Sequence, residues 1–323
     1  MDLSNPVAVA LPCPVCRAPT RARLRDLYDD RYGYPGLFTL QQCDSCGHLH
    51  IPAAFTPEEL GRLYTGYYPR GDFVLESFNA EQERHGFWSW LDGDRGSAFR
   101  WVPRDVRVLD IGCGVGQTLA YHRNRGCEAV GIEADANVQP IAARYGLDIH
   151  QGIFDGTQFE SGSFDYVTLD QVAEHVPDPH ALMQGVARVL KPGGKVIVTT
   201  PNPNSLGARL YGRHWLNWHV PYHLQFYTRE SLEIVARGAG LSVIHCETMT
   251  ASNWQYYQWR HVLLFPRRGE KSAFWSSGIT GTPSLIPRLV IALARRLYLQ
   301  LWISRLLDFI GLGDNYVFIL QKP

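Results

Sequence analysis

Three glycines recur at alternate positions, Gly112, Gly114 and Gly116, directly after an apolar run that contains Asp110. Glycine lets the backbone adopt φ > 0 and lets a ligand approach bare N–H groups. The spacing is G-x-G-x-G, which differs from the G-x-G-x-x-G of dinucleotide-binding folds. A carboxylate this close to the loop would repel a pyrophosphate but suits a cationic ligand. The stretch therefore predicts a binding loop for a ligand that carries a positive charge.

A second acid ends the next predicted strand. Residues 129–133 form a short apolar run, and Glu133 lies about 20 residues beyond the glycine loop, where a carboxylate can accept both hydroxyls of a ribose. We predict Glu133 as the ribose ligand, with Asp135 as a weaker candidate.

Four cysteines form two C-x-x-C pairs, Cys13 with Cys16 and Cys43 with Cys46. Four thiolates in two such pairs can close a tetrahedral Zn²⁺ site that has no open position, which is a structural site. The neighbouring His48 and His50 are possible competing ligands, but four thiols suffice, and we expect both histidines to be ordinary loop residues.

Histidines are the candidates for proton transfer. His175 follows the fourth predicted strand, and His219 and His223 lie in the aromatic segment after the fifth. A histidine with a pKa near neutrality can take the proton of a reacting hydroxyl group. We predict that one of these three is a general base; the alternative is that they orient the loop or serve as its hinge.

These residues need a parallel sheet to position them. Strand and helix patterns alternate from residue 106 to about residue 250, which predicts right-handed crossovers and a doubly wound α/β sheet. Ligands of such sheets bind at the carboxyl ends of the strands. The predicted strands cover residues 106–111, 129–133, 148–150, 163–170, 195–200 and 241–247, with a last strand at 315–320.

Several motifs make residues 105–250 resemble class I S-adenosylmethionine (SAM) methyltransferases: the glycine loop, F-D-x-V at 164–167, E-H-V at 174–176 and L-K-P-G-G at 190–194. The resemblance implies a Rossmann-like seven-stranded sheet whose last strand inserts antiparallel between the fifth and the sixth. It also implies that SAM is bound by Asp110, Gly112, Cys113, Gly114, Gly116, Glu133, Asp155, Asp170 and Gln171.

Three further resemblances refine this prediction. The cysteine pairs resemble the zinc ribbon that precedes many bacterial methyltransferase domains, and residues 219–228 resemble the acceptor-side loop of such enzymes. Ubiquinone-biosynthesis O-methyltransferases carry E-x-x-E-H after the fourth strand, which can hold a divalent metal. Here Gln171 replaces the first acid before Glu174 and His175. An amide is a much poorer ligand than a carboxylate, so we do not expect metal-assisted chemistry.

The predicted domains are a zinc ribbon at 1–55, a helical lead-in or lid at 56–104, and a methyltransferase domain at 105–323 with an insertion at about 250–312. The lead-in begins with a capping pattern, Thr56 to Glu59. Its tyrosines, Tyr67 and Tyr68, either cover the SAM pocket or pack the ribbon onto the core. We expect the aromatic residues of 81–101 to pack on the sheet.

Within the insertion, residues 287–310 predict one amphipathic helix. Arginines interrupt each of its apolar runs, so the helix is not expected to span a bilayer. Such a helix can serve as a dimer interface, as a lid over the acceptor pocket or as a peripheral membrane contact.

Composition limits the partners. The 31 basic and 31 acidic residues balance, and the N/D-P-P-Y/F motif of base-methylating enzymes is missing after the fourth strand, so no nucleic-acid partner is predicted. Residues 1–11 lack the pattern of a signal peptide, and seven cysteines without one favour a reducing cytoplasm. We expect a cytoplasmic protein, with peripheral contact at the inner membrane face as an option.

The sequence therefore predicts a SAM-dependent methyltransferase with a structural Zn²⁺ ion. The resemblance to zinc-ribbon methyltransferases, which often modify sugars and glycans, implies O-methylation of a sugar hydroxyl in glycan or lipid-linked saccharide biosynthesis. The aromatic insertion could also stack on pyranose rings. The alternatives are O- or N-methylation of a small secondary metabolite or quinone, and a SAM-binding scaffold protein without turnover.

Overall fold

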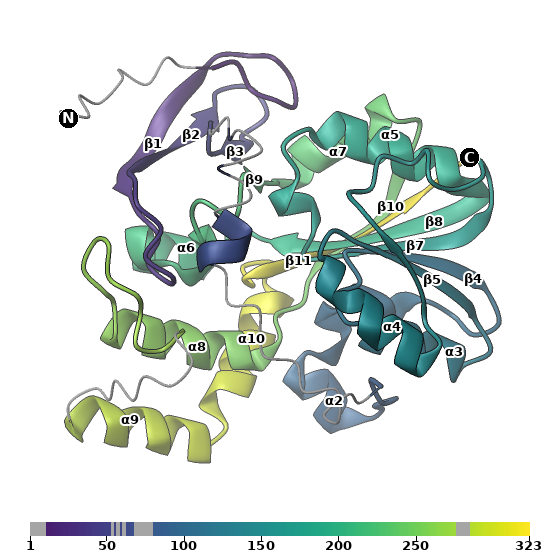
Figure 1. Ribbon diagram of the computed structural model, residues 1–323. Coiled ribbons are helices and arrows are strands. Elements are labelled where there is room, and N and C mark those ends of the chain that lie inside the picture. Colours follow the sequence, from purple (N-terminus) through teal and green to yellow (C-terminus); the bar gives the residue numbers. More distant parts are fainter. Residues whose placement is uncertain (1–10, 53–54, 56–58, 60–62, 68–79, 276–284) are drawn as a thin grey trace.

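The computed structural model describes residues 11–52, 55, 59, 63–67, 80–275 and 285–323 (Figure 1). Its centre is a seven-stranded sheet with the strand order β10-β11-β8-β7-β4-β5-β6. These strands are β4 (Arg107–Ile111), β5 (Glu128–Glu133), β6 (Asp148–Gln151), β7 (Phe164–Asp170), β8 (Leu190–Pro201), β10 (Ser242–Thr248) and β11 (Asn315–Gln321).

The last strand runs against its neighbours. β11 pairs antiparallel with both β8 and β10, whereas β4, β5, β6, β7 and β8 pair in parallel. This confirms the predicted Rossmann-like sheet with an antiparallel last strand between the fifth and the sixth. The chain builds outward from β4 in one direction and then returns to β7 on the other side. The sheet therefore has its switch point, and its expected ligand crevice, between β4 and β7.

Helices cover both faces of the sheet, and consecutive strand residues face opposite sides. Leu109 and Phe318 belong to one buried apolar cluster, and their neighbours Val108 and Val317 belong to another. Strands buried on both faces explain the nearly continuous apolar runs of the sequence. The covering helices are α3 (Gln117–Arg123), α4 (Gln139–Tyr145), α5 (Pro179–Val189) and α7 (Arg229–Gly238).

A second sheet carries the cysteine pairs. β1 (Thr20–Leu27), β2 (Phe38–Cys43) and β3 (Leu49–His50) pair antiparallel, and β9 (Gln225–Phe226) from the histidine segment adds a fourth strand. The ribbon and the predicted acceptor-side loop therefore share one sheet. His48 is in the loop before β3, as expected, whereas His50 belongs to β3. Both histidines are buried, and His48 Nε2 lies 2.9 Å from Gln225 Oε1.

The insertion contains α8 (Ser252–Leu263), α9 (Leu285–Arg296) and α10 (Leu299–Phe309). The prediction of one helix over 287–310 is wrong, because Tyr298 adopts the left-handed conformation, with φ of 58°, and separates α9 from α10. Among the described residues, no helix is both long and apolar enough to cross a membrane.

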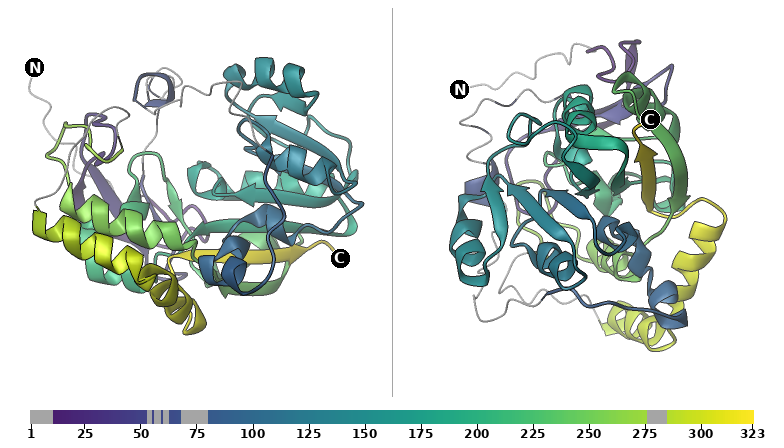
Figure 2. Two further views of the ribbon diagram at one scale, coloured as in Figure 1. Left: turned by 90° about the horizontal axis from the view of Figure 1, so that it is seen from below. Right: turned by 90° about the vertical axis from the view of Figure 1, so that its right-hand side faces the viewer.

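The lead-in matches the prediction only in part: Phe99 is buried and Trp101 packs against the core under the sheet, but three other aromatic residues depart from it. Most of the expected helix start at Thr56 to Glu59, and Tyr68 as well, lie outside the described residues. Helix α2 (Phe87–Asp92) leaves Phe87, Trp88 and Trp90 exposed, so these three do not pack on the sheet. The reason is placement: α2 lies beside α10, at the edge of the molecule (Figure 2).

Candidate active site and cysteine cluster

The glycine loop connects β4 to α3 at the switch point. Gly112, Gly114 and Gly116 all have positive φ, of 71°, 52° and 82°. A Cβ added to Gly112 would lie 2.6 Å from Val172 Cγ2, and one added to Gly116 would lie 2.7 Å from Leu147 Cδ1. A Cβ added to Gly114 would meet no atom within 4 Å. The outer glycines therefore permit close packing, and Gly114 faces the open space in which a ligand can meet bare backbone.

Glu133 holds this loop from the end of β5. Its Oε2 accepts a hydrogen bond from the Gly114 N–H at 3.0 Å, and its Oε1 accepts one from the Asp135 N–H at 3.0 Å. Each carboxylate oxygen keeps a further lone pair for a ligand hydroxyl. The predicted ribose residue therefore lies beside the predicted loop.

Asp110 is buried beneath the loop. One of its oxygens accepts from Thr118 Oγ1 at 2.5 Å and the other from Thr168 Oγ1 at 2.7 Å, and burial raises its pKa. These bonds tie the first turn of α3 to β4 and β7. Asp110 thus shapes the loop from below.

Two other predicted SAM residues are Cys113, within this loop, and Asp155, which follows β6. Cys113 is buried against β5, because a Cβ added to Gly131 would lie only 2.5 Å from its sulfur. Asp155 is in the exposed loop after β6, and hydrogen bonds from the hydroxyl and N–H of Thr157 lower its pKa.

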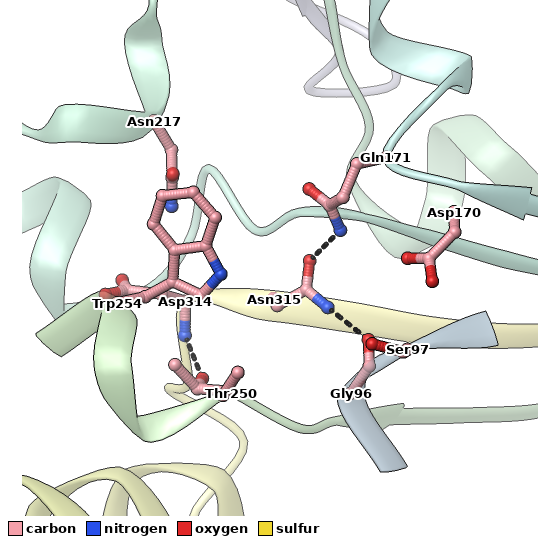
Figure 3. A pocket seen from close by; sticks show the side chains of 10 residues that line it. Gly96, Ser97, Asp170, Gln171, Asn217, Thr250, Trp254, Asp314 and Asn315 are labelled. Carbon is pink, nitrogen blue, oxygen red and sulfur yellow. Dashed lines mark hydrogen bonds between the residues drawn. The ribbon is translucent and has the colours of Figure 1, made fainter. Parts of the chain in front are cut away.

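A pocket opens over the carboxyl ends of β7 and β8, next to this loop. It is lined by residues of five separate segments, 96–97, 170–171, 217, 250–254 and 314–315 (Figure 3). None of its lining residues is a histidine.

Amide side chains form one wall of the pocket. Gln171 Nε2 donates to Asn315 Oδ1 at 2.8 Å, and Asn315 Nδ2 donates to the Gly96 carbonyl at 3.2 Å. The Trp254 indole and the Asn217 amide lie opposite Gln171 and Asn315 (Figure 3). The pocket therefore combines an aromatic surface with several hydrogen-bonding groups.

The pocket also contains two carboxyl groups. Asp170 accepts from Thr199 Oγ1 at 2.5 Å and from the Ala98 N–H at 3.1 Å, and burial raises its pKa to about 6. Asp314 accepts from Trp215 Nε1 at 3.2 Å, and burial likewise raises its pKa to about 6.

Sequence reasoning predicted Asp170 and Gln171 as SAM-binding residues, and it missed four residues of this pocket, Asn217, Trp254, Asp314 and Asn315. The available signal was positional. Because β11 is antiparallel to β8, the residues just before β11 lie at the carboxyl edge of β8. Trp254 lies in the first turn of α8, the helix that follows β10.

The three candidate bases lie together. The ring centroids of His175 and His223 are 4.8 Å apart, and those of His219 and His223 are 4.9 Å apart. Burial lowers the pKa of His175 to about 4 and the pKa values of His219 and His223 well below the ordinary range. This differs from the near-neutral pKa that we assumed, because uncharged imidazole is favoured away from water.

Besides the four cysteines described below, Glu174, His175 and His223 form a group of potential metal ligands. One ligand atom from each lies within 4.8 Å of the others. Nδ1 of His175 donates to the Tyr222 carbonyl at 2.9 Å, and Nδ1 of His223 donates to the Asn217 carbonyl at 2.8 Å, which leaves each Nε2 lone pair unprotonated. Glu174 Oε1 is buried and has no hydrogen-bond partner among the described residues.

Two imidazoles and a carboxylate are a common ligand set for divalent transition metals, and metal-bound histidines usually donate their other N–H to a carbonyl. These residues fit a divalent cation. Burial raises the pKa of Glu174 to about 8, and a bound cation would favour its ionised form and fix the orientation of all three side chains. The E-x-x-E-H comparison pointed to Glu174 and His175, and we expected no metal-assisted chemistry there because Gln171 replaces the first acid. It did not point to His223, which comes from a segment 48 positions beyond His175.

The four predicted zinc ligands also lie together. Sγ of Cys13 is 3.7 Å from Sγ of Cys46, and Sγ of Cys16 is 3.4 Å from Sγ of Cys43. A tetrahedron with Zn–S bonds of about 2.3 Å has edges of about 3.8 Å, so these sulfur positions fit a structural Zn²⁺ ion. Burial raises the pKa of Cys13 to about 11, and a bound cation would stabilise its thiolate.

The ribbon also contacts the histidine cluster. The loop between β1 and β2 is held by Asp29, which accepts the N–H groups of Arg31, Tyr32 and Tyr34 at 2.9 Å each. From this loop the Tyr32 ring meets His219 edge-on, with centroids 5.7 Å apart. The ribbon therefore contacts the histidine cluster, and His223 of this cluster bonds Asn217, which lines the pocket.

The sequence and the fold were compared with known proteins. A family model described as "Methyltransferase domain" matches residues 75–246. A ubiquinone biosynthesis O-methyltransferase of Xanthomonas oryzae pv. oryzae is 29% identical over 174 residues, which cover 51% of this chain and 72% of that protein. The enzyme of the same name from Xanthomonas campestris pv. campestris is 27% identical over the same shares.

Among solved structures, the [4+2]-cyclase SpnF resembles the chain with a TM-score of 0.50 and 20% identity, covering 85% of this chain and 98% of the cyclase. This likeness concerns the fold alone. The matched family region contains the glycine loop and the histidine segment but ends before Trp254 and Asn315, so it leaves much of the pocket unassigned.

Proposed function

Because the chain belongs to the methyltransferase domain family, it is a SAM-dependent methyltransferase, and we propose that it methylates a hydroxyl oxygen of a sugar held in the pocket above β7 and β8. The observation that supports a sugar is the pocket lining. An indole can cover the apolar face of a pyranose ring, and the amides of Gln171, Asn217 and Asn315 can donate to and accept from its hydroxyl groups.

When bound, SAM supplies a methyl group on a positively charged sulfur. The chain's part is to hold that group: the Gly114 backbone faces the open space, and Glu133 offers lone pairs to two ribose hydroxyls. We propose that Gly112, Gly116, Cys113 and Asp110 act by shaping the loop, and that Asp155 lies toward the adenine.

The acceptor side must align an oxygen with the methyl carbon, and alignment of this kind supplies most of the rate in such transfers. Asp170 lines the pocket, and with a pKa of about 6 it is mostly ionised at neutral pH, so it can accept the hydroxyl proton. His223 Nδ1 donates a hydrogen bond to the carbonyl of Asn217, and Asn217 lines the pocket. We propose that His175, His219 and His223 hold Asn217 and its segment in position beside the pocket.

A second acceptor class is a phenolic hydroxyl of a quinone precursor or other small metabolite; the Xanthomonas relatives are named for O-methylation in ubiquinone biosynthesis. A planar phenol could also stack on Trp254, and an O- or N-methylated small metabolite would use the same pocket. Both acceptor classes require Trp254, but the sugar makes greater use of the amides.

The test uses SAM with a deuterated methyl group and two acceptor panels, nucleotide-linked or lipid-linked sugars and phenols, with mass spectrometry of the products. We expect a deuterated methyl ether on a sugar. Trp254→Ala should lower that turnover by about tenfold or more, because stacking and alignment are both lost.

Trp259→Ala is the matched control, since this half-buried residue is on the same helix but outside the pocket lining. Labelling of phenols alone would contradict the sugar proposal and leave the enzyme class intact. Equal losses in the two variants would contradict the role of Trp254.

A further inference from the structure

Large apolar side chains gather on the outside of α2, α9 and α10, which we call the apolar face. Leu285, Leu289, Leu293 and Leu297 recur at every fourth position along α9 and the turn after it, and each is more than half exposed. Residues at this spacing form one stripe along a helix. The stripe points into solvent, although a core helix would bury it.

α10 and α2 extend the apolar face with aromatic residues. Trp302 and Phe309 of α10 are exposed, Phe309 to 89%. The Phe87 ring of α2 lies 6.1 Å from the Trp302 ring, and the Trp88 ring lies 6.3 Å from the Tyr298 ring, measured between centroids. In Figure 1 the three helices follow the lower edge of the molecule, so segments about 200 residues apart share one surface.

The charges on these helices are one-sided. Arg295 and Arg296 are exposed. The acids of the three helices are already engaged: Asp308 pairs with the buried Arg305 at 2.8 Å, and Asp92 pairs with Arg84 at 2.9 Å. In the described parts of these three helices, no acid is therefore left unpaired to meet Arg295 or Arg296 of a second copy of the chain.

We propose that the apolar face docks on the surface of an anionic lipid bilayer. Helices with leucine and aromatic residues on one side and arginines beside them lie in the plane of the membrane interface, and anionic lipid attracts the arginines. Tryptophan and tyrosine are the residues that favour this interface. The helices lie on the membrane and do not cross it.

The apolar face is connected to the pocket. α8 packs against both α9 and α10, and Trp254 of α8 lines the pocket. Docking would hold the pocket close to the lipid surface, which suits a sugar carried on a lipid. This last step rests on the proposed function, whereas docking itself does not.

The test is co-sedimentation of the full chain with vesicles of phosphatidylcholine alone or with phosphatidylglycerol, at low and high salt and without an acceptor. We expect binding to the anionic vesicles that weakens with salt. Leu293→Glu and Trp302→Glu should each weaken it by about tenfold or more, because each places a charge on the inserted side.

Leu210→Glu is the matched control, an exposed leucine on α6 (Leu206–Tyr211), outside the apolar face. Leu210→Glu should bind the anionic vesicles as the unaltered protein does. All three variants should keep the normal melting temperature, so that a loss of binding cannot be attributed to unfolding. The proposal is overturned by absence of vesicle binding, by equal binding to neutral vesicles, or by a dimer in sedimentation that Leu293→Glu dissociates. Methyl transfer to a water-soluble acceptor is measured separately, so either result leaves the proposed function open to its own test.

Discussion

The two sides of the ligand crevice are built differently. Most of the proposed cofactor side lies within one strand–helix–strand unit, residues 107–133, where the glycine loop, Asp110 and Glu133 bond to one another or to adjacent elements. The proposed acceptor side is assembled from five segments between residues 96 and 315. A site built locally leaves a motif in the sequence, and a site built from distant segments does not. The two sides should accordingly fail separately when single residues are changed.

The largest effect is expected from Gly114→Asn. Asparagine tolerates positive φ, but its side chain would fill the space that the loop leaves for the ligand, so affinity for S-adenosylhomocysteine should fall about 100-fold or more. Gly193→Asn is the control, because Gly193 also has positive φ and open space but lies near the start of β8, at the opposite end of the strands. Calorimetry that finds equal affinities in both variants would contradict the assignment of the cofactor side.

Damage to the ribbon should affect the acceptor side alone. Cys43→Ser should remove the zinc, which metal analysis should find at about one ion per chain in the unaltered protein, and should lower the melting temperature. Acceptor turnover should fall, because β9 belongs to the ribbon sheet, while SAM affinity persists. Cys246→Ser, outside the cluster, should keep the zinc. A ribbon without zinc and with normal turnover would oppose this prediction.

A third prediction concerns cation binding by Glu174, His175 and His223, which lie behind the pocket. We expect Mn²⁺ to bind the zinc-loaded protein, and His223→Asn to weaken that binding by about 10- to 100-fold. His219→Asn is the control, since its ring touches His223 but is not in the ligand group. Titration calorimetry that detects no Mn²⁺ binding, or equal loss in the two variants, would exclude the group as a metal site.

The smallest effect concerns stability and pH. The pKa of Asp314 in the folded protein is about 6, above its unfolded value, so the folded state binds more protons and stability falls as pH rises between about 4 and 6. Asp314→Asn should flatten that slope and raise the free energy of unfolding at pH 7 by about 2 kcal/mol.

On the cofactor side, the pKa of the exposed Asp155 is lowered, so its contribution is present above its unfolded pKa and is lost on acidification. Asp155→Asn should therefore leave the slope between pH 4 and 6 unchanged. Urea unfolding at several pH values measures both variants. An unaltered slope in Asp314→Asn would refute the burial argument.

The same contrast explains what could be predicted from sequence. The alternation of strands and helices and the position of Gly114 and Glu133 follow from apolar periodicity and glycine spacing, which are local properties. The order of the sheet followed from the resemblance to class I methyltransferases. The break at Tyr298 has no local signal, since leucines continue on both sides of it. Trp88 was expected inside because tryptophan is usually buried, but α2 packs on α10 at the edge of the molecule.

The histidines illustrate the remaining limit. Their types suggested a base with a near-neutral pKa, but a pKa depends on burial, which arises only when the ribbon loop and the histidine segment meet. Trp254 and Asn315 likewise become neighbours only through the pairing of β10 with β11 and of β11 with β8.

The central claim is that two separable sites share one crevice, and the most direct measurement sets S-adenosylhomocysteine affinity beside methyl transfer in two variants. Gly114→Asn should lose both affinity and turnover, and Trp254→Ala should keep the affinity and lose turnover. A Trp254→Ala protein that loses cofactor affinity as fully as Gly114→Asn, or a Gly114→Asn protein that binds normally, would contradict the account.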